Sequence, residues 1–217
     1  MRFLITAGPT REPLDPVRYL SNRSSGKMGY AIVAAALADH HDVTLISGPV
    51  ALAAPRGAEI VRVTTGDEMF AAVSPQFARC DVFVMCAAVC DYKPVQRASG
   101  KMKKERTRFS LELEPTRDIL ASLTSGAHDC FVVGFAAETE ALAANAQRKL
   151  VEKNCDLLVA NDVGRADIGM DSHDNELMIF SKWGAPKKLP HQKKTELARA
   201  LLKIILEVRE NCLTKKT

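Results

Sequence analysis

The sequence lacks the long apolar segments of a membrane protein. Its longest apolar runs, at residues 30–38 and 82–90, have nine residues each, whereas a helix that crosses a bilayer needs about 20. Residues 1–8 form an apolar start that is too short for the core of a signal peptide and has no cleavage site. We therefore expect no transmembrane helix, no membrane partner and a cytoplasmic protein.

No two cysteines have the C-x-x-C spacing of a zinc or thiol-redox site. Several of them lie inside apolar runs, where a free thiol behaves as a small hydrophobic side chain. We expect no metal bound by the protein itself and reduced thiols, as in a cytoplasmic compartment. The six are Cys80, Cys86, Cys90, Cys130, Cys155 and Cys212.

Neither sign of charge dominates. Lys and Arg total 30 against 26 for Asp and Glu, a net charge of +4 that suits an enzyme of anionic small molecules at least as well as a nucleic-acid binder. The apolar fraction of 47% excludes intrinsic disorder along most of the chain. At about 150 residues per domain, we expect a single domain at 1–210 and a basic, frayed tail at 211–217.

Short apolar runs alternate with longer amphipathic stretches. The runs are mostly continuous, which is typical of strands covered on both faces, and alternating strands and helices predict parallel pairing through right-handed crossovers. The fold class expected is therefore α/β, with a Rossmann-like, doubly wound, mainly parallel sheet. The expected strands are 3–6, 43–46, 60–63, 82–85, 131–133 and 157–160, and the expected helices are 26–39, 67–79, 118–124 and 138–153.

Two segments depart from this pattern. Residues 109–113 alternate apolar and polar side chains, and runs at 177–180 and 186–189 flank Trp183-Gly184-Ala185 like the strands of a hairpin. We expect them to form a small antiparallel extension used for dimerisation. A last helix is expected at about 194–208.

Glycines and hydroxyl groups gather just before the first helix, in the segment S-N-R-S-S-G-K-M-G at 21–29. At a helix N-terminus such residues present backbone N–H groups and the positive end of the helix dipole to an anion. A simple serine cap would need only one or two of them, so with Lys27 and two nearby arginines we favour a phosphate site.

The two commonest phosphate motifs are absent. A Walker loop requires Ser or Thr after Gly-Lys, but Met28 follows Gly26-Lys27. A dinucleotide site requires an acid near the end of the second strand, where the chain has Ser47-Gly48-Pro49. NAD is disfavoured, and an NADP-dependent reductase that binds through Arg56 stays as a weaker alternative.

Small residues and an acid follow the fourth strand. Ala87 and Ala88 would let a ligand approach the backbone, and Asp91 would add a directed polar group, although it could also cap a turn. The loop at 101–108 then has five cations in eight residues. It lacks the aromatic side chains typical of nucleic-acid binding, and it could instead close over a triphosphate. An RNA-binding module remains an alternative.

The later strands end in Phe135, which could stack on a base or belong to the core, and in Asn161. Lys149 and Lys153 are four residues apart on an expected helix and project to one side, toward either a ligand or solvent.

Together and in this order, these motifs resemble the phosphopantothenoylcysteine synthetase family of coenzyme A biosynthesis, across about residues 4–205. The segments that carry the resemblance are 5–13, 15–18, 21–29, 47–49, 87–92, 101–104, 133–139, 153–157 and 160–162.

The resemblance implies a phosphopantothenate–cysteine ligase. A nucleoside triphosphate, usually CTP in bacterial members and ATP as the alternative, would activate the carboxylate of 4′-phosphopantothenate as an acyl-nucleotidyl anhydride and release pyrophosphate. The amine of cysteine would then form the amide and release the nucleoside monophosphate. Mg²⁺ with the triphosphate and a homodimer with shared sites are also implied.

The resemblance further implies roles for single residues. Asn22, at the reacting carboxyl group, and Lys101, at the phosphates, would be catalytic. The substrate would be bound by Ala87, Ala88 and Asp91, and its phosphate by Arg18 of a neighbouring subunit. Nucleotide binding would involve Gly8, Ser24, Gly26, Gly29, Arg117, Asp118, Ile119, Leu120, Phe135, Lys149, Lys153 and Asn161.

Three positions depart from the family pattern. Pro9 replaces a glycine and has no N–H to donate to a phosphate. Arg117 replaces a proline at a helix start, which weakens the expectation of CTP over ATP. Cys90 replaces a small alanine.

Overall fold

The expected parallel strands lie in one eight-stranded sheet. The computed structural model describes residues 1–104, 108–164 and 168–214. Its large sheet has the order β12-β11-β10-β9-β6-β1-β4-β5. The six parallel strands are β1 (Arg2–Ala7), β4 (Asp42–Ser47), β5 (Glu59–Arg62), β6 (Val82–Met85), β9 (Phe131–Glu138) and β10 (Leu157–Asp162).

Counted along the chain, these six strands stand in the order 3-2-1-4-5-6, which is that of a doubly wound dinucleotide-type fold. The predicted Rossmann-like class is therefore confirmed. The order reverses between β1 and β6, and ligands of such folds bind beyond the carboxyl ends of the strands at this point.

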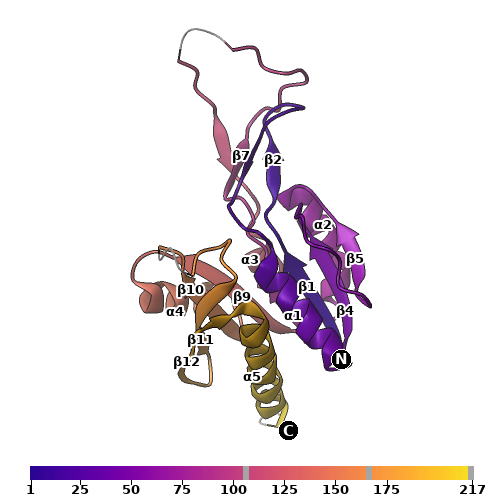
Figure 1. Ribbon diagram of the computed structural model, residues 1–217, viewed down its shortest axis with the longest axis vertical. Coiled ribbons are helices and arrows are strands. Elements are labelled where there is room, and N and C mark those ends of the chain that lie inside the picture. The colour runs from indigo at the N-terminus through magenta and orange to yellow at the C-terminus, as the bar shows by residue number, and fades with distance from the viewer. Residues whose placement is uncertain (105–107, 165–167, 215–217) are drawn as a thin grey trace.

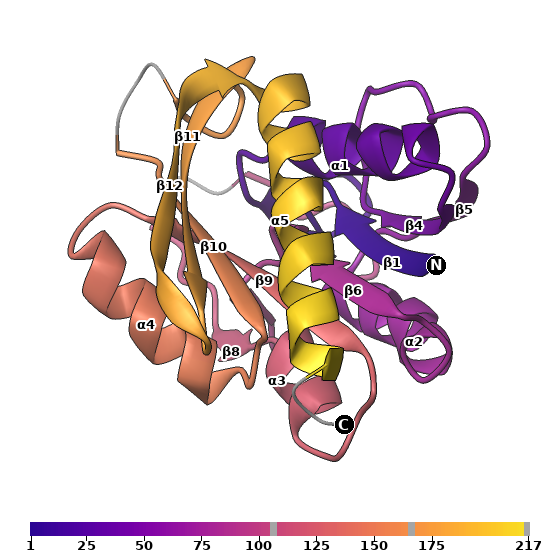
Figure 2. The ribbon, with the colours of Figure 1, turned by 90° about the horizontal axis from the view of Figure 1, so that it is seen from below.

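Helices cover both faces of the sheet (Figure 2). On one face lie α1 (Lys27–Ala38) and α5 (Lys194–Thr214), and on the other α2 (Gly66–Phe77), α3 (Ile119–Thr124) and α4 (Leu142–Glu152). Successive residues of a strand point to opposite faces, so Phe3 and Ile5 pack in the first core while Leu4 packs in the second. This explains why the strands are continuously apolar.

The hairpin expected around residues 183–185 is present, but it extends the main sheet. β11 (Asp174–Ser181) pairs antiparallel with β10, and β12 (Gly184–Lys193) forms the exposed edge. The indole of Trp183 stacks on Phe131, with ring centroids 6.3 Å apart. The expected antiparallel extension is therefore confirmed for this hairpin, which continues the main sheet from the edge of β10; its use in dimerisation stays a prediction.

Two other hairpin-like pairs rise from the carboxyl edge of the sheet (Figure 1). β2 (Arg11–Pro13) pairs with β3 (Tyr19–Ser21), and β7 (Tyr92–Pro94) pairs with β8 (Leu113–Pro115). We call the described residues of 11–21 and 92–115 the arm. Part of the basic loop, including Arg106, lies outside the described residues.

Several expected boundaries differ from the structure. The strand expected at 109–113 does not form; only Leu113 belongs to β8, because β7 offers just three partners. α4 begins at Leu142 rather than 138, because β9 continues to Glu138 beside Asp162 of β10. α5 continues to Thr214, so residues 211–214 of the expected frayed tail are helical.

No helix within the described ranges is long and apolar enough to cross a membrane. All six cysteines have free thiols.

Candidate active site

A cavity of about 550 Å³ opens beyond the carboxyl ends of β6, β9 and β10, beside the reversal of strand order. It is bounded by the start of α1, the segment after β6, the start of α3 and two lysines at the end of α4. Of the residues singled out in the sequence, it is lined by Asn22, Ser24, Gly26, Gly29, Ala87, Ala88, Asp91, Arg117, Asp118, Ile119, Leu120, Phe135, Lys149, Lys153 and Asn161.

The first turn of α1 faces this cavity without a side-chain cap. Gly26 is the N-cap, with φ of 77° that favours glycine. Its own N–H donates to Ser24 Oγ at 3.3 Å, but no side chain caps the N–H groups of the turn that follows. By contrast, Thr65 caps α2 and Asp118 caps α3. The free N–H groups and the helix dipole make the start of α1 suitable for a phosphate.

Close packing of α1 on β1 depends on Gly29. A Cβ atom at this position would lie 2.5 Å from the Cβ of Ala7. The glycines of the motif thus allow the turn at Gly26 and bring the helix start against the strand.

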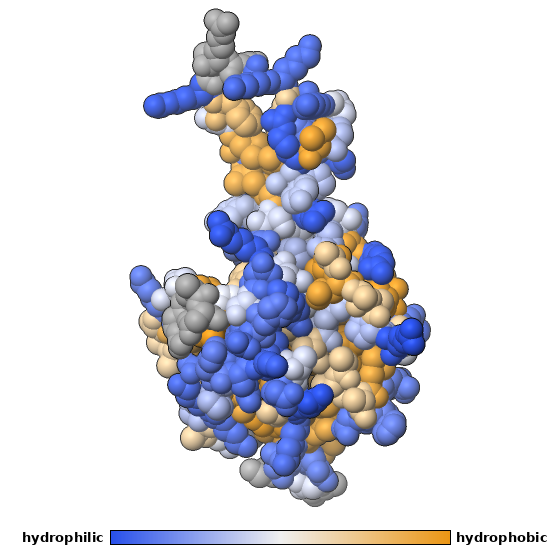
Figure 3. Space-filling view, in the orientation of Figure 1, coloured by the Kyte–Doolittle hydropathy of each residue, from blue (hydrophilic) through white to orange (hydrophobic). Residues whose placement is uncertain are grey.

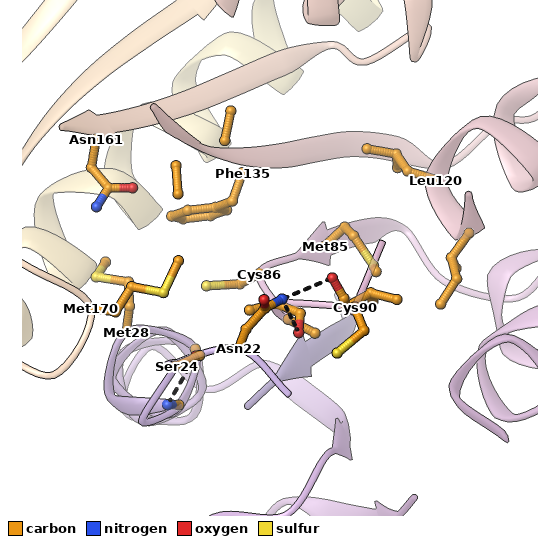
Figure 4. A pocket seen from close by; sticks show the side chains of 18 of the residues that line it. Asn22, Ser24, Met28, Met85, Cys86, Cys90, Leu120, Phe135, Asn161 and Met170 are labelled. Atoms are coloured by element: carbon orange, nitrogen blue, oxygen red, sulfur yellow. Dashed lines mark hydrogen bonds between the residues drawn. The ribbon is translucent and has the colours of Figure 1, made fainter. Parts of the chain in front are cut away.

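Asn22 is fixed against the segment that follows β6. Its Nδ2 donates to the carbonyls of Ala88, at 3.2 Å, and Val89, at 2.9 Å (Figure 4). Because both amide hydrogens are used, Oδ1 remains as the acceptor for a ligand. The side chain is therefore held in place before any substrate binds.

The same segment is held along β1 and its continuation. The Ala88 amide donates to the Gly8 carbonyl at 2.9 Å, and the Cys90 amide donates to Thr10 Oγ1 at 2.9 Å. Gly8 does not line the cavity; its φ of 79° shapes the turn behind it. The amide of Thr10 donates to the carbonyl of Ala88 at 3.2 Å, so the backbone around Pro9 is engaged with this segment as well.

Five cationic side chains and two carboxylates line the cavity, which gives it a positive potential. Three of the cations are already paired, and Lys27 binds Asp171 at 3.1 Å. Lys149 binds Glu138 at 2.7 Å, and Lys153 binds Asp118, the cap of α3. The two lysines thus project to one side of α4 as predicted, but they meet carboxylates from β9 and α3.

Arg117 packs its guanidinium over the ring of Phe70, 4.3 Å from the centroid. It lines the cavity from the start of α3. Arg56, the residue considered for NADP, is exposed and does not line this cavity.

Two expected site residues, Arg18 and Lys101, are on the arm and not in the cavity. Arg18 binds Asp15 through Nε at 3.1 Å, and its Nη2 donates to the carbonyl of Met102, next to Lys101. The Met102 amide donates to Asp15 Oδ2 at 3.2 Å. Asp15, Arg18 and the backbone of Met102 thus form a second cluster, next in the chain to the exposed Lys101.

Asp15 is the centre of that cluster. Burial alone would raise its pKa, but hydrogen bonds from the amides of Val17, Arg18 and Met102 and the charge of Arg18 outweigh it. The pKa of Asp15 is therefore lowered below its ordinary value.

Sequence reasoning missed several residues that line the cavity, among them Cys86, Thr116, Met170, Asn175 and Lys194. Burial raises the pKa of the Cys86 thiol to about 12, so it stays protonated. Asn175 and Lys194 come from the start of β11 and of α5. The sequence argument considers residues that follow the ends of strands, so it does not reach them. The sequence contains one signal for Lys194. A lysine in the first turn of a helix lies at the positive end of the helix dipole, where a cation is unfavourable.

A family model described as "DNA/pantothenate metabolism flavoprotein C-terminal domain" matches residues 1–208. The chain belongs to this family. The resemblance inferred from the sequence is thereby confirmed at the level of the family.

The relatives agree. The chain is 47% identical over 209 residues to the coenzyme A biosynthesis bifunctional protein CoaBC of Vibrio cholerae, covering 95% of this chain and 52% of that protein. It therefore spans about half the length of that relative. The crystal structure of the C-terminal domain of a CoaBC protein matches with a TM-score of 0.81 and 39% identity, over 96% of each chain.

A mutant of Cab2 in complex with phosphopantothenate-cysteine has the same fold, with a TM-score of 0.78. The match covers 100% of this chain and 89% of the Cab2 chain, but at 18% identity it shows the fold alone.

Proposed function

We propose that this chain is a phosphopantothenate–cysteine ligase of coenzyme A biosynthesis. The observation that carries the proposal is the convergence of the uncapped start of α1, the fixed amide of Asn22 and the small residues Ala87 and Ala88 on one positive cavity. Family membership and the CoaBC relatives support the same reaction.

In the first step, the carboxylate of 4′-phosphopantothenate attacks the α-phosphorus of a nucleoside triphosphate. A new P–O bond forms, the bond between the α-phosphorus and the oxygen that bridges to the β-phosphorus breaks, and pyrophosphate leaves. The α1 N-terminus and Lys27 bind phosphate oxygens, and Ala87 and Ala88 leave room for the substrate beside their backbone. Charge that develops on the phosphates is stabilised by these preorganised donors.

In the second step, the amine of cysteine attacks the acyl carbonyl, the C–N bond forms and the nucleoside monophosphate leaves as the amine loses a proton. Asn22 holds the reacting carboxyl region, since its position is fixed by two backbone carbonyls. None of the protein's own cysteines takes part.

CTP is the proposed nucleotide, with ATP as the competing one. Phe135 lies across the cavity from Asn22 (Figure 4) and offers a ring on which a base could stack. Arg117 and Asp118 add a donor and an acceptor near the start of α3.

Mg²⁺ is proposed to enter with the triphosphate. Magnesium is usually held by one or two carboxylates together with substrate phosphates and water. Asp91 provides an exposed carboxylate at the cavity, whereas Asp118 is engaged by Lys153 and by the start of α3. Asp91 is thus the residue that fits the metal, which would neutralise phosphate charge there.

We further propose that the arm dimerises the protein and completes the site. Six of the ten exposed large hydrophobic side chains among the described residues belong to it, namely Val17, Tyr19, Tyr92, Val95, Phe109 and Leu113. Figure 3 shows a hydrophobic band on the arm below a hydrophilic tip. Such a concentration is typical of an interaction surface. In a two-fold dimer, Arg18 and Lys101 would reach the partner's cavity.

The direct test is to incubate the protein with CTP, Mg²⁺, 4′-phosphopantothenate and cysteine and to measure pyrophosphate, CMP and the amide product. We expect all three in equal amounts, and less product with ATP. The proposal fails if neither nucleotide gives release that depends on phosphopantothenate. Binding of NADPH instead would favour the NADP-dependent reductase. Salt-sensitive binding of RNA would favour the RNA-binding module.

A further inference from the structure

Lys194 lies at the cavity, and the reaction described above does not use it. It is the first residue of α5, it is only 5% exposed, and its side chain lines the cavity. A cation at this position is disfavoured by the helix dipole, so its burial there calls for a specific reason.

The ammonium group of Lys194 binds three backbone carbonyls. Its Nζ lies 2.7 Å from the carbonyl oxygen of Ser172, 3.1 Å from that of Met170 and 3.5 Å from that of Gly169. The backbone amide of Lys194 also donates to the carbonyl of His173, at 3.0 Å. An ammonium has three donors, and all three are directed to one segment, residues 169–173.

The start of α1 also holds this segment. Ser25 Oγ donates to the carbonyl of Met170 at 3.1 Å. Lys27 Nζ donates to the carbonyl of Asp171 at 2.5 Å and to its Oδ1 at 3.1 Å. Residues 169–173 therefore bridge the starts of α1 and α5.

This bridge forms a wall of the cavity. Met170 lines it, and in Figure 4 Met170 lies on the side of Met28, away from Leu120 and the start of α3. The wall thus stands beside the uncapped helix N-terminus proposed to bind phosphate, and it shares Lys27 with it.

Stability alone does not explain a buried ammonium in this place. Burial lowers the pKa of Lys194, and the charge of Lys27 lowers it further, whereas Cys86, Asp171 and Asp174 act in the opposite direction. A buried charge held by neutral carbonyls loses much of its hydration energy, and an apolar side chain of similar size is often no less stabilising.

We propose that Lys194 is a positioning residue for the nucleotide: it holds residues 169–173 against the start of α1, so that Lys27 and the first turn of α1 are preorganised for the phosphates. The inference rests on the proposed function. It predicts an effect on nucleotide affinity rather than on the chemical step, because Lys194 acts through the wall and Asn22 is held elsewhere, by Ala88 and Val89.

The test compares Lys194→Met and Lys194→Arg with Lys203→Met, which removes an exposed lysine from the same helix. For Lys194→Met we expect the KM for CTP to rise about tenfold, as for a lost set of hydrogen bonds to a charge, with kcat nearly unchanged. Arginine should restore part of the affinity, and Lys203→Met should behave as the parent protein. A fall in kcat at unchanged KM would overturn the proposal.

A second measurement needs no substrate. In Lys194→Met, amide hydrogen exchange should become faster in peptides covering 168–175 and stay unchanged in the central strands. Unchanged exchange there would refute the anchoring. Faster exchange with unchanged affinity for CTP would mean that Lys194 anchors the segment without positioning the nucleotide. That result would also overturn the proposal.

Two further experiments distinguish the ways in which the proposal could fail. If Lys194→Met does not fold, Ser25→Ala removes the second hydrogen bond to the Met170 carbonyl and should shift exchange and CTP affinity in the same direction, by less. If the parent protein has no ligase activity, the proposed function fails, while equilibrium binding of CTP and hydrogen exchange still decide the role of Lys194.

Discussion

The cavity and the arm differ in how their functional side chains are held. Around the cavity, Asn22 and the segment after β6 are fixed by hydrogen bonds to core strands. On the arm, Arg18 lies in the turn between β2 and β3, and Lys101 lies in the long loop between β7 and β8, beside exposed apolar side chains. This difference fits the proposal that the cavity of one subunit binds the substrates and that the arm of the other subunit completes the site.

The largest effect is expected at the cavity. Asn22→Asp should lower the overall ligase rate by about 100-fold and change the affinity for CTP much less. An aspartate cannot donate to the carbonyls of Ala88 and Val89 and sets a negative charge against them. The variant and the parent protein would be compared by steady-state rates and by equilibrium binding of CTP.

The matched control is Asn154→Asp, because the amide of Asn154 also donates to a carbonyl, that of Thr124, but outside the cavity. It should keep the parent rate. Equal losses of rate and of CTP affinity in Asn22→Asp would make Asn22 a structural residue.

The next effect concerns the apolar surface of the arm. Leu113→Glu should turn dimers into monomers, because a charge on a buried interface is costly. The specific activity should fall nearly as far as in Asn22→Asp, since a monomer lacks the partner's Arg18 and Lys101. Sedimentation velocity and rates at one protein concentration measure both. Val151→Glu, at an exposed apolar residue of α4, should leave dimers and activity intact; a dimeric, fully active Leu113→Glu would contradict the proposed interface.

A smaller effect is expected at Lys101. Lys101→Gln should slow pyrophosphate release about fivefold, since a charge that stabilises the phosphates in the transition state is lost. Rapid-quench measurements follow this step directly. Lys104→Gln, from the same exposed loop, serves as the control, and an unchanged rate in Lys101→Gln would remove Lys101 from the catalytic residues.

The smallest effect concerns the charge cluster of the arm. Because the pKa of Asp15 is lowered in the folded protein, its carboxylate stabilises the fold above the ordinary pKa of about 3.9. That contribution is lost as the pH falls through the lower pKa of the folded state. Asp15→Asn should therefore lower the Tm at pH 6, and the difference from the parent should shrink below pH 4. A constant difference would contradict the shift.

The parallel sheet and much of the cavity could be predicted from the sequence. Continuous apolar runs locate strands that are buried on both faces, and ligands bind where such strands end. Ala87, Asp91 and Phe135 stand at or just beyond the ends of expected strands, and all of them line the cavity. Their roles in binding stay predictions.

The rest depends on contacts between distant parts of the chain. Nothing in the sequence around Lys149 and Lys153 indicates that Glu138 and Asp118 pair with them. The strands of the arm are too short for a periodic pattern, and residues 109–113 have the pattern but no partner strand along their length. Lys194 reaches the cavity only because β11 and β12 return the chain to α1.

The division between body and arm is tested most directly by mixing two variants that are each nearly inactive, Asn22→Asp in the cavity and Arg18→Ala on the arm. Each must first be shown to form dimers. When they are co-expressed, a mixed dimer with two-fold symmetry has one intact cavity facing one intact arm. We expect about a quarter of the parent activity to return from random pairing. Activity no higher than that of either variant alone, in dimers shown to be mixed, would contradict sites shared between subunits.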